Sequence, residues 1–157
     1  MSLIGDMMRS YRAPRGVMQA QVERGITEPQ TLFYAMLFGM MNLIANYPRA
    51  AYNAPDPDTL AGMMAGLFIA YVFFLPLVLF GLAAIIHWVI LRFGGQATWG
   101  QARRAMIWST VTMIPFILVT GAAYIFQNST LVSIVNVITA VVFTWQLWSN
   151  FKQVEFY

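Results

Sequence analysis

The chain has 157 residues, of which 59% are hydrophobic and only 10% are charged, and its mean hydropathy is +0.63. A soluble domain of this size could not bury so much apolar surface, so the composition predicts an integral membrane protein. The chain contains no cysteine, which excludes disulfides, thiol catalysis and thiolate metal sites. The net charge is only +3, and the position of the charges along the chain is more informative than their sum.

Residues 1–30 precede the first long apolar run and are interpreted as a cytoplasmic or interfacial segment. In residues 3–11 the apolar side chains recur at helical spacing, which predicts a short basic amphipathic helix lying in the membrane interface. A disordered tail is the equally weighted alternative. A second short helix is expected over residues 16–24, after Pro14 and ended by Gly25. The segment carries four arginines and no long apolar core, so it is not expected to be a secretory signal peptide.

Four membrane spans are predicted within a bundle covering residues 31–148, at about 32–47, 60–91, 105–126 and 131–147. The stretch from Pro48 to Thr59 contains three prolines and is expected to be a loop, with Asp58 or Thr59 capping the next helix. The last residues, 149–157, are expected to form a polar cytoplasmic tail. The fold class is therefore all-α, a polytopic helical bundle with an N-terminal interfacial helix.

The second predicted span is longer than the hydrocarbon core, so it must tilt, kink or protrude. Pro76 is the expected kink point, because it leaves the Val72 carbonyl without its helical partner. We expect Pro76 to face protein, where the freed carbonyl can be accommodated. Beyond this span, the pair Gly94-Gly95 ends the helix, and Thr98 with Gln101 predicts a capping box for the next.

Lysine and arginine are distributed unevenly among the predicted connections. Eight of the nine basic residues fall in the N-terminal segment, the loop after the second span or the C-terminal tail, and only Arg49 falls on the opposite side. The positive-inside rule then predicts that both termini are cytoplasmic. Five of the arginines are candidate contacts to lipid headgroups: Arg9, Arg12, Arg15, Arg103 and Arg104. Topology explains these charges better than nucleic-acid binding does.

No residue pattern indicates catalysis. His87 is the only histidine, and it has no carboxylate on its own predicted helix, so a helix-packing role is favoured over a metal or catalytic one. All acidic residues fall outside the predicted spans, which argues against an ion-coupled carrier. Nucleotide-binding glycine motifs and zinc-protease motifs are absent from the sequence, and no cofactor is expected.

Uncharged polar residues form stripes on two of the spans. Asn42 and Asn46 share a face of the first span, and Asn136 lies on a polar face of the fourth. In hydrocarbon such groups need partners, so helix packing is favoured over a polar ligand pocket. Gly62 and Gly66 form a GxxxG pattern at the start of the second span, a further candidate helix-packing site.

The stretch from Arg92 to Leu118, RFGGQATWGQARRAMIWSTVTMIPFIL, resembles the Yip family, named for Ypt-interacting proteins. The N-terminal RAPRGVMQAQVERGITEP and the late VVFTWQLWSNF are similar in order and spacing to bacterial members. Two features differ from the family pattern: members usually have five spans, and eukaryotic members carry an acidic-Leu-x-Gly-Pro motif that is missing here. The resemblance therefore implies a bacterial-type membrane protein and does not extend to Rab-type GTPases or vesicle traffic.

The leading hypothesis is a non-catalytic interaction protein, an accessory or assembly subunit that packs against a larger complex of the bacterial inner membrane. Its expected partners are membrane lipids and other integral membrane proteins or a second copy of the chain. The alternative is a small-molecule or lipid transporter that uses the faces of Asn42, Asn46 and Asn136 as a polar path. A membrane enzyme is the third possibility and would require a role for His87.

Overall fold

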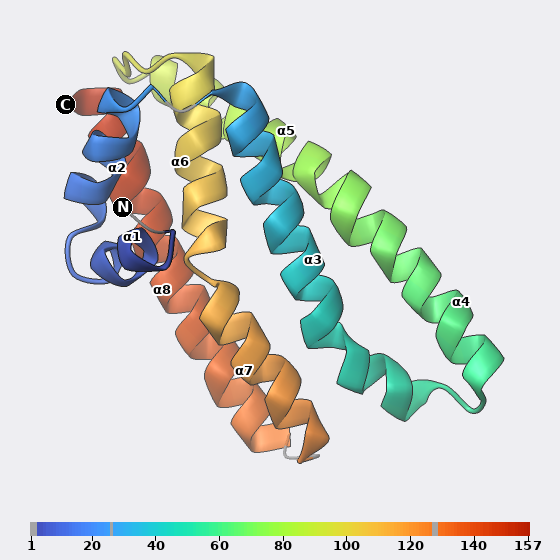
Figure 1. Ribbon diagram of the computed structural model, residues 1–157. Coiled ribbons are helices and arrows are strands. Elements are labelled where there is room, and N and C mark those ends of the chain that lie inside the picture. Colours follow the sequence, from blue (N-terminus) through green and yellow to red (C-terminus); the bar gives the residue numbers. More distant parts are fainter. Residues whose placement is uncertain (1–2, 26, 127–128) are drawn as a thin grey trace.

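The computed structural model describes residues 3–25, 27–126 and 129–157, and this part of the chain is built from helices (Figure 1). The helices are α1 (Leu3–Ser10), α2 (Pro14–Glu23), α3 (Glu28–Asn53), α4 (Pro57–Phe68), α5 (Leu75–Leu91), α6 (Trp99–Val111), α7 (Ile114–Ile125) and α8 (Ser129–Phe156). A π-helical stretch, η1 (Ile69–Phe74), joins α4 to α5. The predicted all-α polytopic bundle is confirmed.

Among the described residues, three helical stretches are long and apolar enough to cross a membrane: Pro57–Leu91, Trp99–Ile125 and Ser129–Phe156. They correspond to the second, third and fourth predicted spans. The first predicted span lies in α3, which is not one of these three, because polar residues recur along it, among them Asn42, Asn46 and Arg49. Helix α3 nevertheless packs along α7 inside the bundle, and its role as a span stays a prediction.

The predicted loop from Pro48 to Thr59 was wrong in extent. Helix α3 continues through Pro48 to Asn53, and α4 begins at Pro57, so only residues 54–56 connect them. Burial of Ala45 and Ala50 against neighbouring helices favours continuing the helix despite the hydrogen bond lost at Pro48. The cap of α4 is Asp56, not the expected Asp58 or Thr59: its Oδ1 accepts from the Thr59 N–H at 2.8 Å, and this bond lowers the pKa of Asp56.

The long second span is one continuous helical stretch with a π-helical segment directly before Pro76. In this segment the Leu75 N–H donates to the Ala70 carbonyl, five residues back. The wider turn is the local adjustment that admits the proline ring. Pro76 is buried, as are Val72 and Leu79, so the prediction that Pro76 faces protein is confirmed.

The turn between α5 and α6 also follows the sequence prediction. Gly94 has a φ of 88°, a conformation that favours glycine, and it lies just beyond the end of α5. Thr98 and Gln101 form the expected capping box: the Gln101 N–H donates to Thr98 Oγ1 at 3.2 Å, and the Thr98 N–H donates to Gln101 Oε1 at 2.8 Å.

The third predicted span is divided into α6 and α7, with Pro115 in the first turn of α7. The expected polar tail over residues 149–157 is instead helical as far as Phe156. Ser149, Asn150 and Glu155 are buried in this part of α8, because it packs against α2 and α6. The C-terminus therefore lies beside α2, at the end of the bundle that carries the α5–α6 turn (Figure 1).

The core lies at this same end of the bundle. Trp108, Ile107 and Met18 are almost completely buried between α6, α2 and their neighbours. Helix α1 is seen nearly end-on in Figure 1, so it lies across the long helices. Its expected helical form is confirmed. Met7 and Asp6 face the protein, while Ile4 and Met8 are exposed, so α1 has both a packed side and a free apolar side.

Candidate functional site

The polar stripes predicted on separate spans meet in one cavity between α3, α7 and α8. The cavity has a volume of about 220 Å³, and its lining includes Asn42, Asn46 and Asn136 together with Thr120 and Thr139. The asparagine side chains of α3 are held by their own helix, since Asn42 Nδ2 donates to the Phe38 carbonyl and Asn46 Nδ2 to the Asn42 carbonyl, each at 3.0 Å. Their amide oxygens remain available to the cavity.

A close approach between α3 and α7 forms one wall of this cavity. A Cβ atom placed on Gly121 would overlap the backbone of Ala45, so only glycine allows the two helices to pack at this distance. Gly39 is equally constrained by the backbone of Tyr71, at the contact between α3 and η1. Gly39 lies three residues before Asn42 and seven before Asn46, on the same face of the helix, whereas Gly121 belongs to no motif and the sequence analysis missed it.

Gly62 and Gly66, the glycines of the GxxxG pattern, do not lie at a close helix contact as Gly39 and Gly121 do. No atom lies within 4 Å of a Cβ built on Gly62 or Gly66, so neither residue mediates helix packing within the chain. Helix α4 buries no residue, and Figure 1 shows it diverging from α3 toward its N-terminal end. The predicted pattern is therefore present on a helix face that the rest of the described chain leaves uncovered.

A second cavity, of about 550 Å³, opens where the ends of α3 and α7 meet the start of α8. Its lining is largely polar and comprises Arg49, Tyr52, Asn53, Tyr124, Ser129, Val132, Ser133 and Asn136. The Arg49 guanidinium lies 5.6 Å from the centre of the Tyr124 ring. Asn136 lines both cavities, so the two are neighbouring parts of one polar groove.

His87 has a partner that the sequence analysis did not find. Its Nδ1 lies 2.6 Å from Oε1 of Glu155, and both side chains are about 1% exposed. The other carboxylate oxygen, Oε2, accepts from the Ala97 N–H at 3.2 Å, and the Trp99 ring packs edge-on against the imidazole at 4.6 Å. The prediction considered only carboxylates on the same helix, whereas Glu155 comes from the last turns of α8.

This pair is buried inside the protein, and its hydrogen bonds link α5, the α5–α6 turn and α8. An acid and a base alone do not form a hydrolytic site without a reachable nucleophile or substrate. No cluster of three or more potential metal-ligating side chains occurs in the part of the chain that the structure describes.

A second buried polar network attaches the N-terminal helices to the bundle. Trp108 Nε1 donates to Ser10 Oγ at 2.9 Å, and Gln146 Nε2 donates to the Ser10 carbonyl at 2.8 Å. The Tyr11 hydroxyl donates to the Thr112 carbonyl, at the junction of α6 and α7. No sequence pattern predicts these contacts, because the partners lie 98 to 136 residues apart.

The arginines predicted to contact lipid headgroups occupy three kinds of environment. Arg9, Arg12 and Arg15 lie on or beside the exposed side of α1 and α2. Arg103 is part of an ion pair with Glu28 at 3.0 Å, half-exposed. Arg104 is buried and donates to the Gln21 carbonyl at 3.3 Å, so its assignment to headgroups was wrong: α6 turns this side chain into the core under α2.

The helical bundle and its long apolar helices define a multi-pass membrane protein. The Yip1 domain matches residues 9–155, which is almost the whole chain, and the chain therefore belongs to the Yip1 domain family. The predicted family is confirmed. No curated protein and no solved structure matches the chain. Members of the family are in general non-catalytic membrane proteins.

Proposed function

We propose that this chain is a non-catalytic interaction protein of the bacterial inner membrane that packs through α4 against another integral membrane protein. The observation that carries the proposal is the exposure of α4, which buries no residue and has open space beside both Gly62 and Gly66. A second copy of the chain is the other partner that fits this face.

The physical basis is the packing of helices in lipid. Apolar helices gain no hydrophobic energy by leaving lipid, so they associate where small residues let their backbones approach closely. On α4, Leu60, Met64 and Leu67 recur on the side that is partly covered, whereas the two glycines lie on another side of the helix. A partner helix could therefore pack on the glycines without displacing α3.

The proposed orientation has both termini in the cytoplasm. It is supported by the uneven distribution of basic residues, eight of the nine lying on one predicted side. Figure 1 shows α2, the α5–α6 turn and the C-terminal end of α8 at the same end of the bundle, and these segments contain Arg15, Arg92 and Lys152.

The test compares Gly66→Leu with Gly81→Leu in protein purified in mild detergent. Gly81 on α5 is a matched control, since it is also exposed and has no atom within 4 Å of its would-be Cβ. Gly66→Leu should abolish copurification of the partner, or self-crosslinking, while Gly81→Leu should leave it intact. A wild-type protein that is only a monodisperse monomer without copurifying protein would contradict the proposal, as would equal effects of the two variants.

The second candidate function is a transporter with a polar path. It is favoured by one observation: Asn42, Asn46 and Asn136, from two different helices, line the same cavity. In proteoliposomes, glycerol or urea efflux should then fall strongly in Asn42→Leu and persist in Thr144→Val, a change at an exposed polar position on α8 that does not line this cavity. Efflux no faster than in protein-free liposomes would exclude this function for these solutes.

A further inference from the structure

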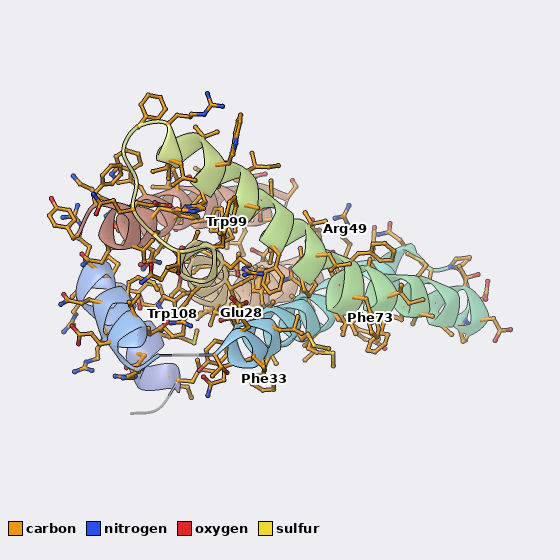
Figure 2. The ribbon with its side chains drawn as sticks, turned by 90° about the horizontal axis from the view of Figure 1, so that it is seen from above. Glu28, Phe33, Arg49, Phe73, Trp99 and Trp108 are labelled. Atoms are coloured by element: carbon orange, nitrogen blue, oxygen red, sulfur yellow. The ribbon has the colours of Figure 1, made fainter. Side chains whose placement is uncertain are left out.

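Arg49 lies where three cavities meet. It lines the polar cavity of about 550 Å³, the smaller cavity of about 220 Å³ that contains the asparagines, and a third of about 440 Å³ between α3 and α4. Figure 2 shows Arg49 toward the α4 end of the molecule, well separated from Trp99 and Trp108 of the core end. It is the only lysine or arginine in the part of these linings that the structure describes.

The charge of Arg49 has no carboxylate partner within the described residues. None of the described ion pairs includes it, and no acidic residue lines any of the three cavities. Its guanidinium contacts the Tyr124 ring, which supplies partial compensation only. Because Arg49 is exposed, an anion from outside the chain can reach its guanidinium and accept charge-assisted hydrogen bonds from it.

Several residues that line the larger cavity together with Arg49 carry hydroxyl groups. Those of Tyr52, Tyr124 and Ser129 line the larger cavity and make no hydrogen bond to another described residue. Ser133 Oγ donates to the Ser129 carbonyl at 2.8 Å, which keeps this wall in place. A guanidinium with several free hydroxyl donors suits a phosphate, because its oxygens can accept from all of them at once.

The cavity between α3 and α4 supplies an apolar surface beside the cation. Met63, Leu67 and Tyr71 form the α4 and η1 side of it, and Ala50 lies on the α3 side. The two helices diverge here (Figure 1), and the cavity between them has a volume of about 440 Å³. Such a surface beside a charged site fits a ligand with a polar head and a hydrocarbon chain.

We propose that Arg49 binds the phosphate of an anionic glycerophospholipid whose acyl chain lies in the groove between α3 and α4. The hydroxyls of Tyr52, Tyr124 and Ser129 donate to the phosphate oxygens, and Met63 and Leu67 contact the chain. This lipid site uses a side of α4 other than the one with Gly62 and Gly66, and it depends on neither proposed function.

The first experiment titrates phosphatidylglycerol, with phosphatidylcholine for comparison, into the purified full chain and counts bound lipids by native mass spectrometry. Arg49→Gln should weaken phosphatidylglycerol binding at least tenfold, and Arg49→Lys should weaken it less. Arg92→Gln is the matched control, because Arg92 is also exposed and also lies over an aromatic ring, that of Trp88 at 4.8 Å. Equal binding by wild type and Arg49→Gln, or equal loss in Arg92→Gln, would overturn the proposal.

The second experiment separates a lipid from a free phosphate and tests the groove. Glycerol 1-phosphate and inorganic phosphate should not displace phosphatidylglycerol at concentrations where the lipid itself competes. If either compound displaced bound phosphatidylglycerol as effectively as the free lipid does, the assignment of the site to a lipid would be refuted. Leu67→Trp should reduce the affinity for the lipid while the thermal midpoint of the protein is maintained. Unchanged affinity would refute the placement of the acyl chain in the groove between α3 and α4. Gly66→Leu should leave lipid binding unchanged, so failure here is distinguishable from failure of the proposed α4 interface.

Discussion

The buried pair of His87 and Glu155 gives a stability prediction whose size and sign follow from its surroundings. His87→Ala removes the group 2.6 Å from Oε1 and leaves the carboxyl, about 1% exposed, with only the Ala97 N–H as a described hydrogen-bond donor. Removing one member of a buried pair typically costs about 3–5 kcal/mol, because the other is left uncompensated. For a chain of this size that is a fall in the thermal midpoint of about 6–20 °C.

The double variant His87→Leu with Glu155→Met tests the reason for this cost. Both polar groups are then replaced by apolar ones of similar volume, and such replacements are often neutral or stabilising. The double variant should therefore be more stable than His87→Ala, by roughly 2 kcal/mol or more. Thermal unfolding in detergent, followed by intrinsic tryptophan fluorescence, measures all three proteins, and far-UV circular dichroism confirms that each retains its helices.

Two outcomes would refute this reasoning. If His87→Ala cost less than about 1 kcal/mol, the carboxyl would not depend on the imidazole. If the double variant were no more stable than His87→Ala, the loss would come from packing and not from an uncompensated carboxyl.

Three further predictions concern other parts of the molecule. Gly121→Val should destabilise the bundle by about 1–3 kcal/mol in the same assay, because its side chain overlaps α3, whereas Gly81→Val should have little effect. Trp108→Phe removes one of the hydrogen bonds that attach the N-terminal helices to the bundle, so trypsin should cleave these helices faster than in the wild type, and unchanged cleavage would contradict this role. In intact cells, a cysteine introduced at Phe93 should be shielded from an impermeant reagent and one at Asn53 should be labelled; the reverse pattern would overturn the proposed orientation.

The structure shows which positions can test the orientation. Ser10 and Ala97 both fall on the predicted cytoplasmic side, but both are buried, so a cysteine there would be shielded whichever way the chain is inserted. Phe93, which is 76% exposed, and Asn53 report on the side of the membrane instead.

The sequence by itself determined the features that arise from local chemistry. The apolar content required a membrane helical bundle, Thr98 and Gln101 specified the start of α6, and Pro76 indicated where the long span must adjust. Each of these depends on residues within about one helical turn of one another, or on the summed hydrophobicity of a segment. Such features can be predicted from a single stretch of sequence, without knowledge of the residues that pack against it.

Only the tertiary structure decided which distant groups meet. Glu155 reaches His87 across 68 residues, Gly121 packs on Ala45, and Arg104 turns into the core although its position in the chain indicated a lipid contact. Even the end of α3 and the helical C-terminal segment were set by burial against other helices, which overrode Pro48 and the polar residues after Trp148. The physical reason is that packing energy depends on surfaces that become neighbours only when the chain folds, and a linear pattern of residues does not specify them.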